Sequence, residues 1–335
     1  MMESTKTSII PGGLSLREVF LRWEWLLVGL IVGVSIVNGR LSPHFWDYAG
    51  LMDAMAVFLE KGFIVLPVAM ILISGEIDIS VSSIVALSSV LMALSFQAGL
   101  PMVLAICVAV AVGTACGAFN GFLITRIPGL SSVIVTLAAN SLFRGIAYIV
   151  LGDRAVGGFP RWYSYLSWGY LGSSSIPFII LAFGIVAVFF GLVLHKTTFG
   201  RKVYAIGNNQ VAARFSGIPV SRIKLILFTL AGVMSGLAAV FLTSKLGSSR
   251  PNVALGYELE VIAIAVLGGV SPAGGKGGIP GAILALILMR LLRYGLGLIN
   301  VPGQVMLVVI GIILVLVVML PNLIGSVRIS RKRFG

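Results

Sequence analysis

Charged side chains are scarce in this sequence. Asp, Glu, Lys and Arg make up 10% of its 335 residues, whereas a soluble domain carries roughly 25%. Apolar residues make up 58%, and the mean hydropathy is +1.08. So few charges could not cover a surface that faces water, which excludes the soluble, disordered and disulfide-stabilised classes. The composition predicts an all-α integral membrane protein.

Groups that could do chemistry are scarce as well. The two histidines, His44 and His195, lie in different polar segments on opposite predicted sides of the membrane. The two cysteines, Cys107 and Cys116, lie in one apolar run at a spacing that points them to opposite faces of a helix, so they cannot pair with each other. The sequence contains no H-E-x-x-H motif. A membrane enzyme is therefore disfavoured, and no catalytic residue or metal site is predicted.

A glycine-rich stretch at 274–278 is similar to a phosphate-binding loop but departs from it. It lacks the G-x-x-x-x-G-K spacing, and Gly277 follows the lysine where a Ser or Thr would bind Mg²⁺. We therefore expect this chain to bind no nucleotide or other cofactor of its own.

About ten apolar stretches are long enough to cross roughly 30 Å of hydrocarbon. They cover residues 24–39, 57–74, 79–97, 101–125, 131–151, 176–194, 222–244, 256–271, 279–298 and 303–321. The sequence thus predicts a polytopic helical bundle over residues 24–321, preceded by a cytoplasmic segment, 1–23, and followed by a basic cytoplasmic tail, 322–335.

Both termini lie on the same side of the membrane if the number of spans is even. With the N-terminus in the cytoplasm, 15 of the 24 Lys and Arg residues fall in cytoplasmic segments, six fall on the opposite side, and three lie within spans or at their ends. Basic residues are enriched in cytoplasmic loops, so this excess predicts cytoplasmic termini.

Glycines recur at four-residue spacing in three of the apolar stretches. Gly113, Gly117 and Gly121 form two overlapping G-x-x-x-G steps, and the pairs 29/33 and 232/236 repeat the spacing. Small residues let helix backbones approach closely in lipid, where no hydrophobic force drives helices together. The spacing predicts a closely packed bundle.

A polar interruption at 75–83 carries Glu76 and Asp78. Each carboxylate would cost a few kcal/mol at the centre of a bilayer, so we expect both at a helix junction, in a cavity or at the cytoplasmic face. Asp78 or Ser80 is placed to cap the following helix. The alternative is a discontinuous helix whose polar break lines a transport route.

The long inner loop, 195–221, predicts a short amphipathic helix. Asn208 or Asn209 is placed to cap it, and Gly217 and Pro219 end it. Its apolar residues recur at helical spacing on one side, with Arg214 off that face: Val211, Ala212, Phe215 and Ile218. Such a helix either rests on lipid or inserts its apolar face into a groove on a soluble partner.

Two acidic residues, Glu258 and Glu260, stand at the outer end of a predicted span. We expect one of them to cap the N-terminus of that helix and the other to pair with Arg250. Salt bridging at the rim and direct ligand contact are both open for these carboxylates.

Four ordered motifs between about Trp25 and Pro321 resemble the permease subunits of bacterial ABC importers for simple sugars, the ribose, xylose, rhamnose and autoinducer-2 group. They are Gly75-Glu-Ile-Asp-Ile-Ser-Val-Ser-Ser83; Val133-Ile-Val-Thr-Leu-Ala-Ala139 with Arg144-Gly145; Phe199-Gly-Arg201, Ala205-Ile-Gly-Asn-Asn209, Ala212-Ala-Arg214 and Gly217-Ile218; and Tyr257-Glu-Leu259, Ile262-Ala263, Val266-Leu-Gly-Gly269 and Gly274-Gly-Lys-Gly277. The chain departs from the family pattern at Glu76 and Ser82, where the family has glycine, and at Arg290 and Arg293 in the ninth span.

The resemblance implies a multi-pass protein of the bacterial inner membrane that pairs with a second permease, identical or different. It further implies two cytoplasmic ATPase subunits, which would bind ATP and Mg, and an extracytoplasmic sugar-binding protein. Segment 205–218 corresponds to the coupling helix of the family. The residues predicted to couple to the ATPase are Gly207, Asn208, Asn209, Ala212, Ala213, Phe215, Ser216, Gly217 and Ile218. Those predicted for the translocation pathway are Glu76, Asp78, Ser80, Thr136, Asn140, Arg144 and Glu258.

The predicted function is import of a small sugar or sugar-like solute of the rhamnose, ribose or autoinducer-2 type. The segments 247–252, 295–300 and 301–304 look most like rhamnose or autoinducer-2 permeases. The alternatives are an ion-coupled secondary transporter, which needs no ATPase, and an ABC permease for branched-chain amino acids.

Overall fold

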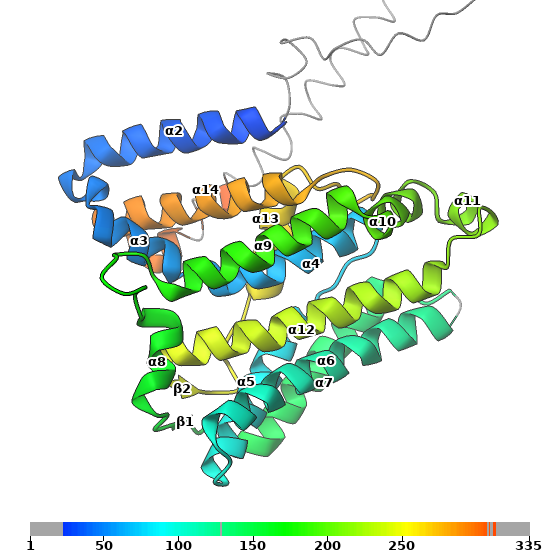
Figure 1. The fold of residues 1–335 in the computed structure, drawn as a ribbon, viewed down its shortest axis with the longest axis horizontal. Coiled ribbons are helices and arrows are strands. Elements are labelled where there is room, and N and C mark those ends of the chain that lie inside the picture. The colour runs from blue at the N-terminus through cyan, green and yellow to red at the C-terminus, as the bar shows by residue number, and fades with distance from the viewer. Residues whose placement is uncertain (1–22, 128, 307, 309–310, 313–335) are drawn as a thin grey trace, which may run out of the picture.

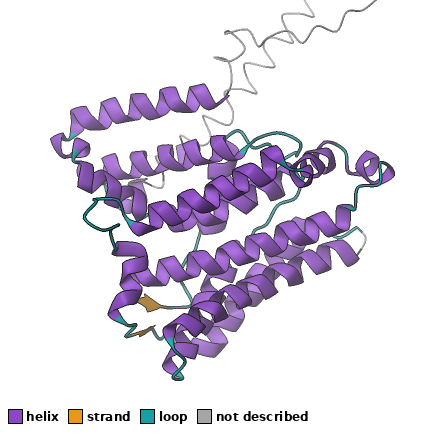
Figure 2. Cartoon of the chain, in the orientation of Figure 1, coloured by secondary structure: helices purple, strands orange, loops and turns teal. Residues whose placement is uncertain are grey.

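The computed structural model describes residues 23–127, 129–306, 308 and 311–312, and these residues form a helical bundle (Figure 1; Figure 2). The helices are α2 (Trp23–Leu41), η1 (Pro43–Trp46), α3 (Tyr48–Ala56), α4 (Leu59–Ile73), α5 (Val81–Gln97), α6 (Met102–Arg126), α7 (Ser132–Leu151), α8 (Arg161–Trp168), α9 (Phe178–Lys196), α10 (Thr198–Asn208), α11 (Gln210–Phe215), α12 (Val220–Leu246), α13 (Tyr257–Leu267) and α14 (Ile279–Leu298). Two short strands, β1 (Val156–Gly157) and β2 (Ser248–Ser249), pair antiparallel. The all-α membrane fold is confirmed.

In the part of the chain that the structure describes, six helices are long and apolar enough to cross a membrane, namely α2, α6, α7, α9, α12 and α14. The pair α3 and α4, bent by 51° at the break between them, makes a seventh if the two helices form one span. The helix α5, with 17 residues, falls just short of that length.

The stretch 256–271, expected to span, forms only the 11-residue helix α13, which rises about 16 Å and is too short to cross the bilayer. Most of the stretch 303–321, the segment 1–22 and the tail 322–335 lie outside the described residues.

The predicted glycine contacts join α6 to α12, which run antiparallel side by side (Figure 1). A Cβ on Gly232 would lie 2.1 Å from the carbonyl oxygen of Gly113, and one on Gly117 would lie 2.3 Å from that of Phe228. Glycine is therefore required where these two backbones touch. The pair Gly29/Gly33 on α2 differs, because added Cβ atoms would meet nothing within 4 Å.

The helix α4 lies at the centre of the core, and each of its residues from Leu59 to Ile73 is buried. It packs against α12, α13 and α9, and the ring of Phe63 stacks on that of Phe241 with centroids 4.9 Å apart. The helix α2 lies along α14, where the Asn38 side chain donates a hydrogen bond to the Leu291 carbonyl at 3.0 Å.

The two ends of the bundle differ in structure. One end carries α8, β1 and β2, and the other carries α10 and α11 (Figure 1); we call the latter the inner end. Here the glycine-rich stretch 274–278 packs on α10 and α4, with the Gly275 amide donating to the Ile73 carbonyl at 2.8 Å. Burial raises the pKa of the Tyr204 hydroxyl on α10, which stays protonated and donates to the Gly277 carbonyl at 2.7 Å.

Candidate functional site: the inner end and the polar break

The inner loop folds into two helices, α10 and α11, where the sequence predicted one. Asn209 separates them and caps α11, because its side-chain oxygen accepts a hydrogen bond from the Ala212 amide at 3.0 Å. Gly217 follows the helix with a φ of +77°, a conformation that glycine adopts without strain. The predicted cap at Asn209 and the predicted end of the helix are both confirmed.

The apolar face of α11 has no partner among the described residues of the chain. Val211 is 63% exposed and Phe215 is 89% exposed, and both lie on a helix that projects beyond the inner ends of α6 and α12 (Figure 1). We call Val211, Ala212 and Phe215 the α11 face. Ala213 lies on the opposite side, 4% exposed and packed into the core, so it is not available to a partner.

The other residues predicted for coupling fall into two groups. Four of them are exposed beside the α11 face: Asn208, Asn209, Ser216 and Gly217. The other two, Gly207 and Ile218, are half-buried. A Cβ on Gly207 would lie 1.8 Å from the Ile73 carbonyl oxygen. Gly207 is therefore required for packing α10 onto the end of α4.

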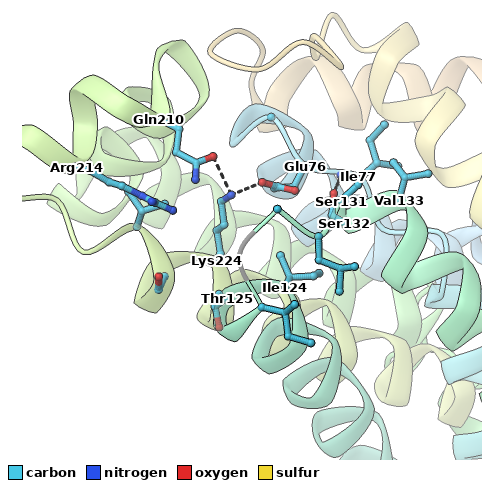
Figure 3. A pocket seen from close by; sticks show the side chains of 16 residues that line it. Glu76, Ile77, Ile124, Thr125, Ser131, Ser132, Val133, Gln210, Arg214 and Lys224 are labelled. Carbon is cyan, nitrogen blue, oxygen red and sulfur yellow. Dashed lines mark hydrogen bonds and ion pairs between the residues drawn. The ribbon is translucent and has the colours of Figure 1, made fainter.

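A cleft of about 560 Å³ opens at the inner end between α11, α12 and the connections α4–α5 and α6–α7 (Figure 3). Lys224, on the first turns of α12, reaches into it. Its ammonium group forms a salt bridge with Glu76 and donates a hydrogen bond to the side-chain oxygen of Gln210 at 3.0 Å. Glu76 thus lies at a helix junction beside a cavity, as expected, and is paired.

The polar break at 74–80, between α4 and α5, is held by side chains of α7. Ser132 accepts a hydrogen bond from the Ile77 amide at 3.2 Å, and Thr136 accepts one from the Ile79 amide at 3.1 Å. These bonds satisfy backbone groups that have no helical partner, which a chain inside a membrane requires.

Asp78 is fully buried in this break. Its Oδ1 accepts hydrogen bonds from the Ser80 amide at 2.8 Å and the Ser80 hydroxyl at 2.6 Å, and Ser80 directly precedes α5. The Asp78 carboxylate thus satisfies the Ser80 amide at the start of α5, while Ser80, the N-cap residue, makes no side-chain capping hydrogen bond. The Oδ2 of Asp78 has no hydrogen-bond partner in the described part of the chain.

The break brings together five of the predicted pathway residues, Glu76, Asp78 and Ser80 from the break itself and Thr136 and Asn140 from α7. Ser82 donates to the Asn140 side-chain oxygen at 3.3 Å, and Thr136 bonds the break as described. Asn120 of α6 joins them by donating to the Ser80 hydroxyl at 2.8 Å. Asn120 was missed because it is one polar residue in a long apolar run with no neighbouring signal.

Arg144 and Glu258 lie at a second irregular segment, between β2 and α13. The Arg144 guanidinium donates to the carbonyl oxygens of Pro251 and Val253, each at 2.7 Å. Glu258 lies near enough to Arg144 to act on it electrostatically. Arg144 therefore holds a non-helical backbone segment against the middle of α7.

Buried ion pairs join the outer ends of α4, α12, α13 and α14. Glu260 pairs with Lys61 and with Arg293, each at 2.7 Å, and Lys245 pairs with Glu60 at 2.6 Å. The expected pairing of either Glu258 or Glu260 with Arg250 is not formed among the described residues, where Glu260 pairs with Lys61 and Arg293 instead. Gly256 is the N-cap residue of α13 and no side chain caps it, but Glu258 and Glu260 both lie in the first turn of the helix, where the dipole favours their charge as expected.

No group of three or more His, Cys, Asp or Glu residues among the described ranges could hold a metal ion. Cys107 and Cys116 are free thiols. The absence of a cofactor on this chain stays a prediction.

Comparison with known proteins gives the family. Residues 50–318 match the family described as "Branched-chain amino acid transport system / permease component". The "Autoinducer 2 import system permease protein LsrD" of Klebsiella pneumoniae is 33% identical over 305 residues, which cover 89% of this chain and 91% of that protein. The protein of the same name from Yersinia enterocolitica is 35% identical over 302 residues, covering 88% and 90%.

No solved structure matches the chain. The matching segment begins before α4 and contains the polar break, α7, the inner loop, and α13 with the glycine-rich stretch after it, which together carry the four sequence motifs. The chain therefore belongs to this family of importer permeases, and it is a multi-pass transport subunit of the bacterial inner membrane.

Proposed function

We propose that this chain forms half of the membrane pathway of an ATP-driven importer for a small sugar-like solute of the autoinducer-2, rhamnose or ribose type. A second permease, identical or different, forms the other half. The inner end faces the cytoplasm, both termini of the chain lie on that side, and two ATPase subunits bind there. A binding protein delivers the solute from the other side of the membrane. ATP and Mg bind to the ATPase subunits.

The α11 face is the observation that carries this proposal. A helix whose apolar side chains are this exposed needs a hydrophobic partner. The helix α11 projects beyond the inner ends of α6 and α12, and its exposed residue Ala212 is small. Both features favour a groove on a soluble protein, rather than a lipid surface, as the partner of the α11 face. Closure of the ATPases on ATP moves α11, and differential contacts in the two states switch the pathway from outward-open to inward-open.

The polar break supports a hydroxylated solute. Ser80, Thr136 and Asn140 carry hydroxyl and amide groups on adjoining elements, and such groups exchange hydrogen bonds with sugar hydroxyls. Ser80 and Thr136 are fully buried here, so they meet the solute only in a state in which α5 and α7 separate at the break. The names of the relatives at 33–35% identity point to the same solute class. A branched-chain amino acid is the second candidate, because the description of the matching family names it.

Reconstitution tests the proposal. The chain is placed in proteoliposomes with the second permease, the ATPases and the binding protein of the importer, and uptake of labelled autoinducer-2, rhamnose, ribose and leucine is measured. We expect uptake of one of the first three solutes that needs ATP and all subunits. Uptake by the chain alone under an ion gradient would establish a secondary carrier instead, and ATP-dependent uptake of leucine alone would establish the amino-acid permease.

A further inference from the structure

Lys224 connects three elements that lie far apart in the sequence. It belongs to α12, its ammonium group contacts Gln210 on α11, and the same group forms a salt bridge with Glu76 in the polar break, 148 residues away. Figure 3 shows the Glu76 carboxylate and the Gln210 side-chain oxygen both directed toward the Lys224 nitrogen. One ammonium group therefore bridges α11 and the polar break between α4 and α5.

Burial makes this contact difficult to replace. Lys224 is 7% exposed, and the Glu76 side chain is 14% exposed. A charge at such a site remains stable only while it is paired. When α11 and the start of α12 move, Glu76 must therefore move with Lys224 or exchange its partner.

The surroundings of the pair allow such a movement. The 560 Å³ cleft adjoins the pair and separates it from the α6–α7 connection. The glycine contact with α6 holds α12 from Leu225 onward, where a Cβ on Gly121 would lie 3.0 Å from the Leu225 Cα. The first turns of α12 line the cleft through Ser221 and Lys224 but are buried in the core through Ile223, so this end of the helix has room to move on the cleft side only.

Glu76, the acidic member of the pair, belongs to the polar break that carries the predicted pathway residues. Glu76 directly precedes Ile77, whose amide donates to Ser132. Asp78 follows, and its carboxylate accepts a hydrogen bond from the Ser80 amide at the start of α5. A displacement of Glu76 thus changes the hydrogen bonds that hold the break against α7. The motif pattern that the sequence resembles has glycine at position 76, so this link depends on a side chain that departs from that pattern.

We propose that Lys224 is a positioning residue that transmits the movement of α11 to the polar break through Glu76, with Gln210 keeping the lysine aligned on α11. The inference rests on the proposed function, because α11 moves only if an ATPase binds to it. Lys224 contacts neither the solute nor ATP. Its role is to make the inner end of α12 and the break move as one unit.

The test uses the complete importer in proteoliposomes and measures the ratio of ATP hydrolysis with solute-loaded binding protein to hydrolysis without it. Lys224→Met and Glu76→Gln should each reduce this ratio toward one while the ATPases remain bound. The exchange of both charges, Glu76→Lys with Lys224→Glu, should restore most of the ratio, because the pair re-forms and Gln210 can donate its amide to the new carboxylate.

Lys245→Met is the matched control, since Lys245 forms a similarly buried ion pair with Glu60 at the opposite end of α12. It should lower the unfolding temperature without changing the ratio measured on folded complex. A wild-type ratio in Lys224→Met, an equal loss in Lys245→Met, or no recovery in the charge exchange would each overturn the inference alone. A wild-type importer that moves solute with no bound ATPase would refute the proposed function and this inference with it.

Discussion

Phe215→Ala offers a direct measurement of what the α11 face contributes to docking. Phe215 is 89% exposed, so the substitution removes almost no contact within the chain and should leave its unfolding temperature unchanged. Burying a phenylalanine side chain completely stabilises by about 1.5–3 kcal/mol. Losing about 2 kcal/mol at the docking site corresponds to a roughly 30-fold higher Kd for the ATPase.

The assay is binding of the purified ATPase subunit to the permease in nanodiscs. Phe189→Ala is the control, because Phe189 is also an exposed phenylalanine but lies on α9, away from the inner end; its Kd should equal that of the wild type. If Phe215→Ala binds with wild-type affinity, the α11 face is not the docking surface. If it instead weakens association with lipid alone, α11 is an interfacial helix.

Three further predictions concern packing, capping and the inner end. Gly232→Val should lower the free energy of unfolding by about 1–3 kcal/mol or prevent folding through overpacking against α6, while Gly29→Val, with open space around it, should have little effect; denaturation in detergent compares them. Asn209→Ala removes the cap of α11 and should raise the Kd for the ATPase about fivefold, from a loss of about 1 kcal/mol, whereas Asn209→Asp keeps the cap and should bind normally. Tyr204→Phe loses the hydrogen bond to Gly277 and should destabilise by about 1 kcal/mol; an unchanged unfolding temperature would mean that this bond contributes nothing.

The spans could be predicted from the sequence because bilayer thickness imposes long apolar runs. Eight of the predicted stretches coincide with α2, α4, α5, α6, α7, α9, α12 and α14. The helix α13 shows the limit of this reasoning. A half-helix buried in protein has the same apolar composition as a helix in lipid, so composition does not give its length.

The candidate site also has a part that the sequence predicted and a part that it did not. The cap at Asn209 and the end of α11 at Gly217 depend on local chemistry, and the sequence alone predicted both. The contact between Lys224 and Glu76 was missed because it joins residues 148 positions apart. In the sequence Lys224 was one of many cytoplasmic basic residues, and only the packing of α12 against α4 brings it to the break.

The position of Arg144 constrains how the chain is made. Its carbonyl partner Pro251 follows it by 107 residues, which a ribosome needs about 5–20 s to add. During that interval α7 carries an unpaired guanidinium that costs about 2.5–3.5 kcal/mol to place near the centre of a bilayer. The nascent α7 must therefore stay beside the insertion machinery or an early helix until residues 250–256 arrive, so assembly of this permease finishes late in translation.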